Sequence, residues 1–167
     1  EMPGTPWPPT PEGNHAGPFY LVWLDPAASG ILREQWPYAV AEVGLTTAAA
    51  MRWPQLEVDE DAPLGAALTR QGQVLVATQC MVCHPVAGAG DAAVGPDLTL
   101  PRSPTEYFAP WALRAYIRDP ASLRHWDDMR MTGFPVDVLS DADLDAVVAY
   151  LGYLAERREK AGVAPGK

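Results

Sequence analysis

The chain has only two cysteines among its 167 residues, and they lie three positions apart. A pair this close in sequence cannot join distant parts of a fold, which excludes a disulfide-stabilised scaffold. Long apolar runs are also missing, since no stretch approaches the ~18 residues of a membrane-spanning helix. We therefore expect the two cysteines to have a chemical role, and we expect no membrane span in this chain.

Basic residues are scarce as well. The chain has 12 lysines and arginines against 21 aspartates and glutamates, and its formal net charge is −9. An acidic chain of this kind is a poor partner for nucleic acid or for an anionic membrane surface. We expect its partners to be proteins that offer a basic docking surface.

Proline and glycine are concentrated in residues 1–18, which predicts an extended arm without helix or strand. Residues 19–24 and 36–43 are rich in aromatic and β-branched side chains, a pattern that predicts a short β-hairpin. The helical pattern begins only after these segments. We therefore divide the chain into an N-terminal extension, residues 1–62, and a mainly α domain, residues 63–167.

The second domain shows the periodicity of helices. From Pro63 to about Gln79 the apolar residues fall mostly on one face, which predicts a helix that ends at the first cysteine. Residues 109–118 predict a second helix, ended by the Asp119-Pro120 step. The last helix is the clearest, because Ser140 begins a capping-box pattern and apolar residues then recur at helical spacing. We expect one copy of this domain, since no internal repeat is present.

The two cysteines belong to the motif Cys80-Met81-Val82-Cys83-His84. Cysteines at positions i and i+3 near a helix end project to the same side, so each sulfur can bond to one vinyl group of a single porphyrin. The histidine that follows then lies beneath the porphyrin iron. The motif predicts Cys80 and Cys83 as covalent attachment points for haem c and His84 as the proximal iron ligand.

Two other kinds of site use a cysteine pair at this spacing. A thioredoxin-like redox pair follows a strand in a βαβ context, whereas a helix is predicted to precede this motif. A structural zinc site needs four ligands, and beyond the motif only His15 and His125 remain as further cysteine or histidine ligands. Haem attachment is therefore the favoured interpretation.

The sixth position of an electron-transfer haem is commonly held by a methionine, which raises the reduction potential. Met129 and Met131 lie downstream in one loop, and either could place its sulfur over the haem. His125 is a rival ligand in the same region. The residues alone leave this choice open.

Residues 63–155 or so resemble a class I cytochrome c domain of the bacterial kind with one haem. The resemblance rests on the haem-attachment motif and on three further segments: Gly95-Pro96-Asp97-Leu98, Met131-Thr132-Gly133-Phe134, and Leu139-Ser140-Asp141 leading into the last helix. It implies a helical fold around one covalent haem c. It also implies transfer of one electron at a time between redox proteins, rather than enzymatic catalysis.

The resemblance assigns roles to several residues. In this family the axial methionine stands three residues before an aromatic, which implies Met131 as the ligand, although Thr132 replaces the usual proline. The proline of the Gly-Pro-x-Leu segment packs near the proximal histidine and its carbonyl fixes the ring tautomer, which implies this role for Pro96. The family also crosses its first and last helices through a small residue and an aromatic, a role that suits Gly72 with Tyr150 or Tyr153.

An alternative function is a haem enzyme or gas-binding sensor with an open sixth coordination position. His125 is the only histidine that could then act on the distal side. Attachment of haem to such a motif takes place outside the cytoplasm in bacteria, so we expect a periplasmic or otherwise extracytoplasmic protein. Because no signal peptide precedes the domain, we expect Glu1 to begin the processed form.

The N-terminal extension offers one hint about a partner. Residues 17–23 and 36–38 vaguely resemble a strand pair of molybdopterin-binding oxidoreductase domains, without any cofactor-ligating residue. The chain is thus expected to be either a free carrier or the haem subunit of a redox enzyme. An extension that merely covers the surface of the domain is the simpler interpretation.

Overall fold

The structure is a computed structural model that divides into two compact units, Glu1–Thr47 and Ala48–Lys167. It describes residues 13, 15, 17–29, 36–37, 39–45, 47, 49–60, 66–92 and 94–162. Most of the proline-rich arm lies outside these residues. So does the boundary predicted between residues 62 and 63, and so do the first residues of the helix predicted from Pro63.

The segments predicted as a β-hairpin lie against each other, but they form no regular strand within the described residues. Leu21 N–H donates to the Pro37 carbonyl at 3.2 Å, and Val40 N–H donates to the Phe19 carbonyl at 2.9 Å. The pairing cannot continue because Pro37 has no N–H and Ala39 has a φ of 54°, outside the extended region. The prediction of regular strands was therefore wrong, and an irregular pair takes their place.

A short helix, α1 (Pro26–Ser29), follows the first of these two segments. The Asp25 carboxylate accepts a hydrogen bond from the Ala28 N–H at 3.0 Å, which satisfies one of the donors at the start of this helix. The Tyr20 ring packs edge-on against Trp36, with the ring centroids 6.1 Å apart. These contacts hold the N-terminal unit together locally.

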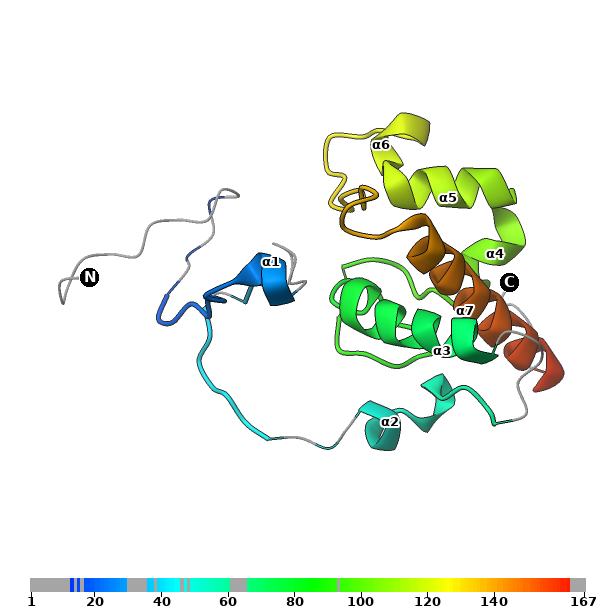
Figure 1. Cartoon of the computed structure of the whole chain (residues 1–167), viewed down its shortest axis with the longest axis horizontal. Coiled ribbons are helices and arrows are strands. Elements are labelled where there is room, and N and C mark those ends of the chain that lie inside the picture. Colours follow the sequence, from blue (N-terminus) through cyan, green and yellow to red (C-terminus); the bar gives the residue numbers. More distant parts are fainter. Residues whose placement is uncertain are drawn as a thin grey trace. The chain divides into compact units, whose positions relative to one another are not determined.

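The second unit is helical, which confirms the mainly α fold class. In chain order its elements are α2 (Ala49–Arg52), the 3-10 turn η2 (Pro54–Leu56), α3 (Ala66–Leu75), the π-helical turn η3 (Val76–Cys80), α4 (Pro104–Tyr107), α5 (Pro110–Arg118), α6 (Pro120–Leu123) and α7 (Asp141–Lys160). Figure 1 shows α3 and α7 lying against each other, with α4 and α5 beyond α7. None of the helices in the described part of the chain is long and apolar enough to cross a bilayer.

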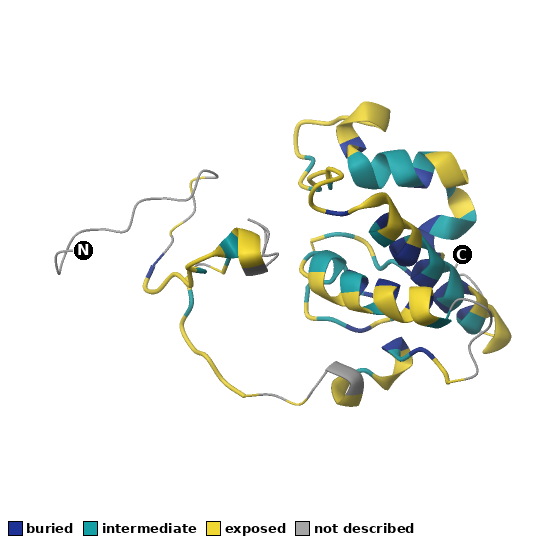
Figure 2. Ribbon diagram, in the orientation of Figure 1, coloured by how far each residue is buried: buried dark blue, intermediate teal, exposed yellow. Residues whose placement is uncertain are grey.

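The core of this unit lies where α3 and α7 cross, and most of the dark-blue buried positions in Figure 2 gather there. A Cβ atom on Gly72 of α3 would lie 2.0 Å from the Ala146 carbonyl oxygen and 2.7 Å from the Tyr150 Cβ. Only a residue without a side chain permits so close an approach of two helices. The crossing thus falls at Gly72 and Tyr150, as the resemblance implied.

The helix ends follow the signals in the sequence. The Ser140 hydroxyl accepts from the Asp143 N–H at 3.1 Å, and the Asp143 carboxylate accepts from the Ser140 N–H at 3.3 Å, which completes the capping box at the start of α7. Helix α5 ends at Arg118 because Asp119 turns extended before Pro120. Helix α3 continues through η3 and ends at the first cysteine of the motif.

One part of the core was missed by the sequence patterns. Residues 44–63 look irregular in sequence, yet Leu56 and Val58 are buried in the core of the helical unit. The Tyr150 hydroxyl donates to the Leu56 carbonyl at 2.6 Å, which ties this segment to α7. Residues 53–58 therefore pack with the helical body.

Candidate functional site

The haem-attachment motif forms a tight turn at the end of η3. The N–H groups of Cys83 and His84 both donate to the Cys80 carbonyl, at 3.1 Å and 2.9 Å. These bonds continue the helical path for one turn, so Cys80 and Cys83 remain about one turn apart. The structure thus gathers the two thiols and the histidine ring in one short segment.

A second segment, residues 95–98, is bonded to the back of this turn. Gly95 N–H donates to the Cys83 carbonyl at 2.8 Å. The His84 side chain bonds to the Pro96 carbonyl oxygen through Nδ1 at 2.7 Å. A carbonyl oxygen can only accept, so Nδ1 must carry the ring proton, and Nε2 keeps its lone pair for another ligand.

The His84 ring is also confined by contact with Gly95. A Cβ on Gly95 would lie 2.3 Å from His84 Cε1 and 2.9 Å from Nε2, distances that no side chain can occupy. The ring therefore packs directly against the Gly95 backbone. Together with the Nδ1 hydrogen bond, this contact fixes the orientation of the imidazole.

Asp97 holds the two segments together, a role that the sequence analysis missed. Its Oδ1 accepts from the N–H groups of Ala87, Thr99 and Leu100 at 3.2, 2.7 and 2.8 Å. Its Oδ2 accepts from the Gly88 N–H at 2.8 Å. An aspartate in a loop rich in glycine and proline is a known signal for such side-chain-to-backbone turns, so the sequence offered a hint.

The Cys80 thiol lies in an apolar setting. Burial, followed by the neighbouring Cys83, raises the pKa of the Cys80 thiol to about 12. The polypeptide therefore presents Cys80 as a neutral thiol at physiological pH, not as a thiolate. A neutral S–H is the form that contributes both atoms when a thiol adds across a vinyl group.

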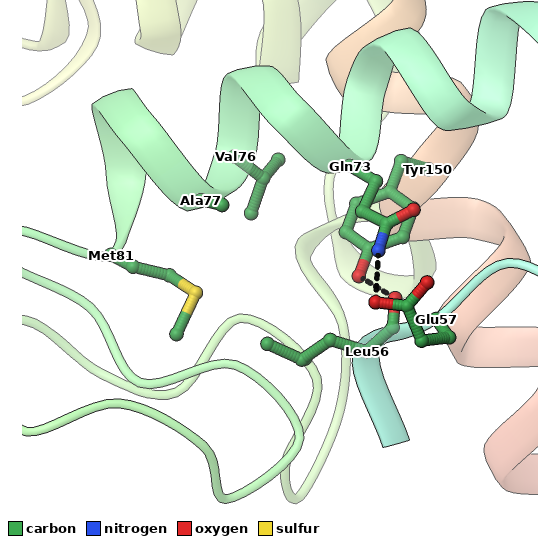
Figure 3. Close-up of a pocket in the computed structure, with 7 residues that line it drawn as sticks. All are labelled: Leu56, Glu57, Gln73, Val76, Ala77, Met81 and Tyr150. Atoms are coloured by element: carbon green, nitrogen blue, oxygen red, sulfur yellow. Dashed lines mark hydrogen bonds between the residues drawn. The ribbon is translucent and has the colours of Figure 1, made fainter. Parts of the chain in front are cut away.

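A small cavity of about 30 Å³ lies behind the motif, between the attachment turn and α7 (Figure 3). Met81 points into it, beside Leu56 and Val76, and Tyr150 closes another side. Its volume suits a single water molecule and no cofactor. Met81 thus packs against the hydrophobic core.

Met131 and Met129 both lie on the connection between α6 and α7 and are both partly buried. The Met129 N–H donates to the Trp126 carbonyl at 3.0 Å, in a turn of its own. The Met131 segment is instead tied to α5, because the Phe134 N–H donates to the Ile117 carbonyl at 3.0 Å. Hydrogen bonds thus join His84 to Pro96, whereas the Met131 segment is joined to α5.

The chemistry of these donors suits haem. Two thiols lie one turn apart, and the imidazole beside them has its Nε2 lone pair available. The connection between α6 and α7 adds two thioethers, Met129 and Met131. A haem iron can take a sulfur ligand of this kind in addition to a histidine. In the part of the chain that the structure describes, no group of three histidine, cysteine, aspartate or glutamate side chains is placed to hold a metal ion.

Comparison with known proteins bears on this geometry. The model of the Cytochrome c family matches residues 69–155, just over half of the chain, and the match spans the attachment motif, the Pro96 segment and most of α7. Neither the curated proteins nor the solved structures gave a match to the chain. The chain therefore belongs to the cytochrome c family, whose cofactor is a covalent haem c with its iron.

Proposed function

We propose that this chain carries single electrons as a class I cytochrome c with one haem, attached through Cys80 and Cys83. His84 and Met131 are the two axial ligands. The hydrogen bond from His84 Nδ1 to the Pro96 carbonyl carries this proposal, because it leaves Nε2 free to bind iron. When bound, the haem supplies the chemistry by gaining and losing one electron at its iron.

The choice of Met131 rests on its setting. Phe134 stands three residues later, packs against the buried core and is bonded to α5, so it anchors the backbone next to Met131. Met129 has no aromatic at that spacing and follows a separate turn. An anchored backbone supports a weak sulfur–iron bond better than a loose one, because less conformational entropy is lost when the bond forms.

The partners are redox proteins, and the acidic character of the chain suits a basic docking surface. The chain works outside the cytoplasm, as a periplasmic carrier or as the haem subunit of an oxidoreductase, for which a molybdopterin-type dehydrogenase is one candidate. Exposed apolar side chains in the N-terminal unit, such as Phe19, Leu24 and Leu45, support the subunit role, because they offer an apolar contact surface. Purification of the native complex separates the two roles, since a subunit remains bound to its enzyme and a carrier does not.

The axial ligands are tested with the oxidised protein. We expect the weak far-red band that marks sulfur–iron ligation in this family. The Met131→Ala variant should lose this band and bind exogenous imidazole, and its reduction potential should fall because a sulfur ligand raises it. Met129→Ala is the matched control and should keep all three properties.

Two results would contradict this assignment. Loss of the band in Met129→Ala, with retention in Met131→Ala, would transfer the ligand role to Met129. A high-spin spectrum in the unmodified protein would show an open sixth position, and the protein would then be a haem enzyme or sensor.

A further inference from the structure

The connection that carries Met131 is bonded to the C-terminal end of α5 at several points. Arg118 Nη1 donates to the Phe134 carbonyl at 2.8 Å and also to the Leu139 carbonyl. Arg118 Nη2 donates to the Asp141 carboxylate at 2.7 Å, at the first residue of α7. One guanidinium therefore holds both ends of the segment between Phe134 and α7.

The shape of the guanidinium makes this arrangement possible. Its N–H donors are fixed in one plane, so several acceptors can be held in a defined geometry. Only 19% of the Arg118 side chain is exposed, so solvent screens its contacts less than it screens those of a surface arginine. Within the held segment, the N–H groups of Val138 and Leu139 both donate to the Pro135 carbonyl, at 3.0 Å, forming a compact turn.

Gly133 shows how closely the loop lies against the same end of α5. A Cβ on Gly133 would be 2.2 Å from the Arg118 carbonyl oxygen and 3.2 Å from the Asp119 Cα. No side chain fits there without movement of the backbone. The residue two positions after Met131 is thus held directly against α5, independently of the guanidinium bonds.

We propose that Arg118 is a positioning residue for the axial methionine, holding the loop so that the Met131 sulfur stays within reach of the iron. This inference rests on the proposed role of Met131. A methionine–iron bond competes with other ligands, and its strength in a protein depends on how tightly the methionine is confined. Loss of the Arg118 contacts frees residues 134–139 and lowers the effective concentration of the sulfur at the iron.

The experiment compares Arg118→Met with Arg114→Met in the haem-loaded protein. Arg114 lies one turn earlier on α5 and also pairs with α7, through Asp145, but it bonds to no carbonyl of the Met131 loop. We expect Arg118→Met to bind imidazole about tenfold more tightly than the unmodified protein, and to lose its far-red band about one pH unit lower as pH rises. Arg114→Met should leave both values unchanged.

Arg118→Lys tests whether the planar array of N–H donors matters or only the positive charge. A lysine keeps the positive charge but lacks the planar array of donors. The imidazole affinity of Arg118→Lys should therefore lie between those of the unmodified protein and of Arg118→Met. Far-UV circular dichroism recorded on every variant shows whether the helices are intact. A purely structural role would lower the unfolding midpoint without changing imidazole affinity in the folded protein.

A second pair of variants tests the loop contact without changing Arg118. Gly133→Ala introduces a methyl group at the closest approach and should also weaken sulfur ligation, whereas Gly152→Ala on α7, with nothing within 4 Å, is the matched control. If Arg118→Met fails to fold, Arg118→Lys and Gly133→Ala carry the test. Imidazole affinities equal to those of the controls would overturn the inference, whether or not the far-red band depends on Met131. Dependence of that band on Met129 instead would refute the proposed function, whatever the behaviour of the Arg118 variants.

Discussion

The Pro96 carbonyl oxygen lies 2.7 Å from His84 Nδ1 and accepts a hydrogen bond from the N–H of this ring. Such a bond makes the imidazole a stronger electron donor through Nε2. If His84 binds the iron as we propose, a stronger donor favours the ferric state and lowers the reduction potential. The Asp97 carboxylate, next along the chain, fixes the loop that presents this carbonyl.

The first prediction concerns Asp97, whose carboxylate accepts hydrogen bonds from four backbone N–H groups. Asp97→Ala leaves these donors without their partner and loosens the Pro96 carbonyl. We expect the free energy of unfolding to fall by about 2–4 kcal/mol. We expect the reduction potential to rise by on the order of 20–40 mV, equivalent to about 0.5–1 kcal/mol at the iron. Urea unfolding and redox titration of the haem protein measure the two effects.

Asp97→Asn is the control for this prediction. An asparagine keeps the oxygen that accepts from Ala87, Thr99 and Leu100, and loses only the acceptor for Gly88. Both changes should then be less than half of those in the alanine variant. An unchanged potential in Asp97→Ala would show that the loop holds Pro96 in place without the carboxylate.

The second prediction concerns the crossing of α3 and α7. In Gly72→Ala, the new methyl group would meet the Ala146 carbonyl oxygen at 2.0 Å, so the helices must separate. We expect a loss of at least about 2 kcal/mol in the free energy of unfolding, because the cost of overpacking exceeds the higher helix propensity of alanine. Denaturant unfolding followed by far-UV circular dichroism measures it.

Gly152→Ala again provides the comparison, since beyond the local backbone of α7 no atom lies within 4 Å of its added Cβ. In the interior of α7 this substitution should raise the free energy of unfolding by about 0.5–1 kcal/mol. Equal effects of the two substitutions would mean that α3 and α7 do not cross at Gly72.

The sequence predicted the parts of the fold that depend on local signals. The capping box at Ser140 and the stop before Pro120 follow from one or two residue types at fixed spacing, whereas the crossing at Gly72 was implied by the family resemblance. The attachment motif is equally local. Neighbouring residues alone determine the capping box, the helix stop and the attachment motif, so these can be identified without knowledge of the tertiary contacts.

The parts that the sequence did not predict depend on distant contacts. Leu56 lies in a segment with no helical or strand pattern, yet it packs in the core with Tyr150, 94 positions later, whose hydroxyl also donates to its carbonyl. Arg118 and Arg158 look like ordinary cations near helix C-termini, where basic residues are common. Only the fold shows that Arg118 bonds to the Met131 loop and that Arg158 is buried.

The third prediction tests the long-range contact of Leu56. Tyr150→Phe removes the hydroxyl that donates to the Leu56 carbonyl at 2.6 Å, and leaves a buried acceptor unpaired. We expect a loss of about 1–2 kcal/mol in the free energy of unfolding. Tyr153→Phe instead removes two exposed hydrogen bonds, one donated to the Asp59 carboxylate and one accepted from the Asp59 N–H, and should cost less than half as much because water replaces them. A larger effect at Tyr153 would contradict the placement of Leu56 in the core.

The last prediction concerns Arg158, whose buried guanidinium donates to both oxygens of Glu106, at 2.8 Å and 2.7 Å. It also donates to the carbonyls of Thr99 and Pro101, at 2.9 Å and 3.0 Å. One side chain of α7 therefore holds α4 and the loop that begins at the Asp97 turn. Removal of one partner from a buried ion pair leaves the other charge without compensation.

The hydrogen bond from Arg158 lowers the pKa of the Glu106 carboxyl below its ordinary value, and burial opposes this only in part. A group whose pKa is lower in the folded state stabilises the fold above its unfolded pKa of about 4.3. That stability is lost as pH falls through the lower, folded pKa. The contribution of Glu106 should thus be constant from pH 7 to pH 5 and decline below about pH 4.3.

Glu106→Gln tests this pH dependence. At pH 7 we expect a loss of about 3 kcal/mol in the free energy of unfolding, because Arg158 remains charged and buried. The gap between this variant and the unmodified protein should narrow below about pH 4.3, when Glu106 itself becomes protonated. Urea unfolding at intervals between pH 7 and pH 3 measures the gap, and other carboxylates cancel from the difference. Asp145→Asn is the control, because it neutralises the carboxylate of an ion pair with Arg114 that is more exposed than the Arg158–Glu106 pair. It should cost less than about 1 kcal/mol at pH 7. A gap that stays constant down to pH 3 would mean that the contact with Arg158 does not depend on the charge of Glu106.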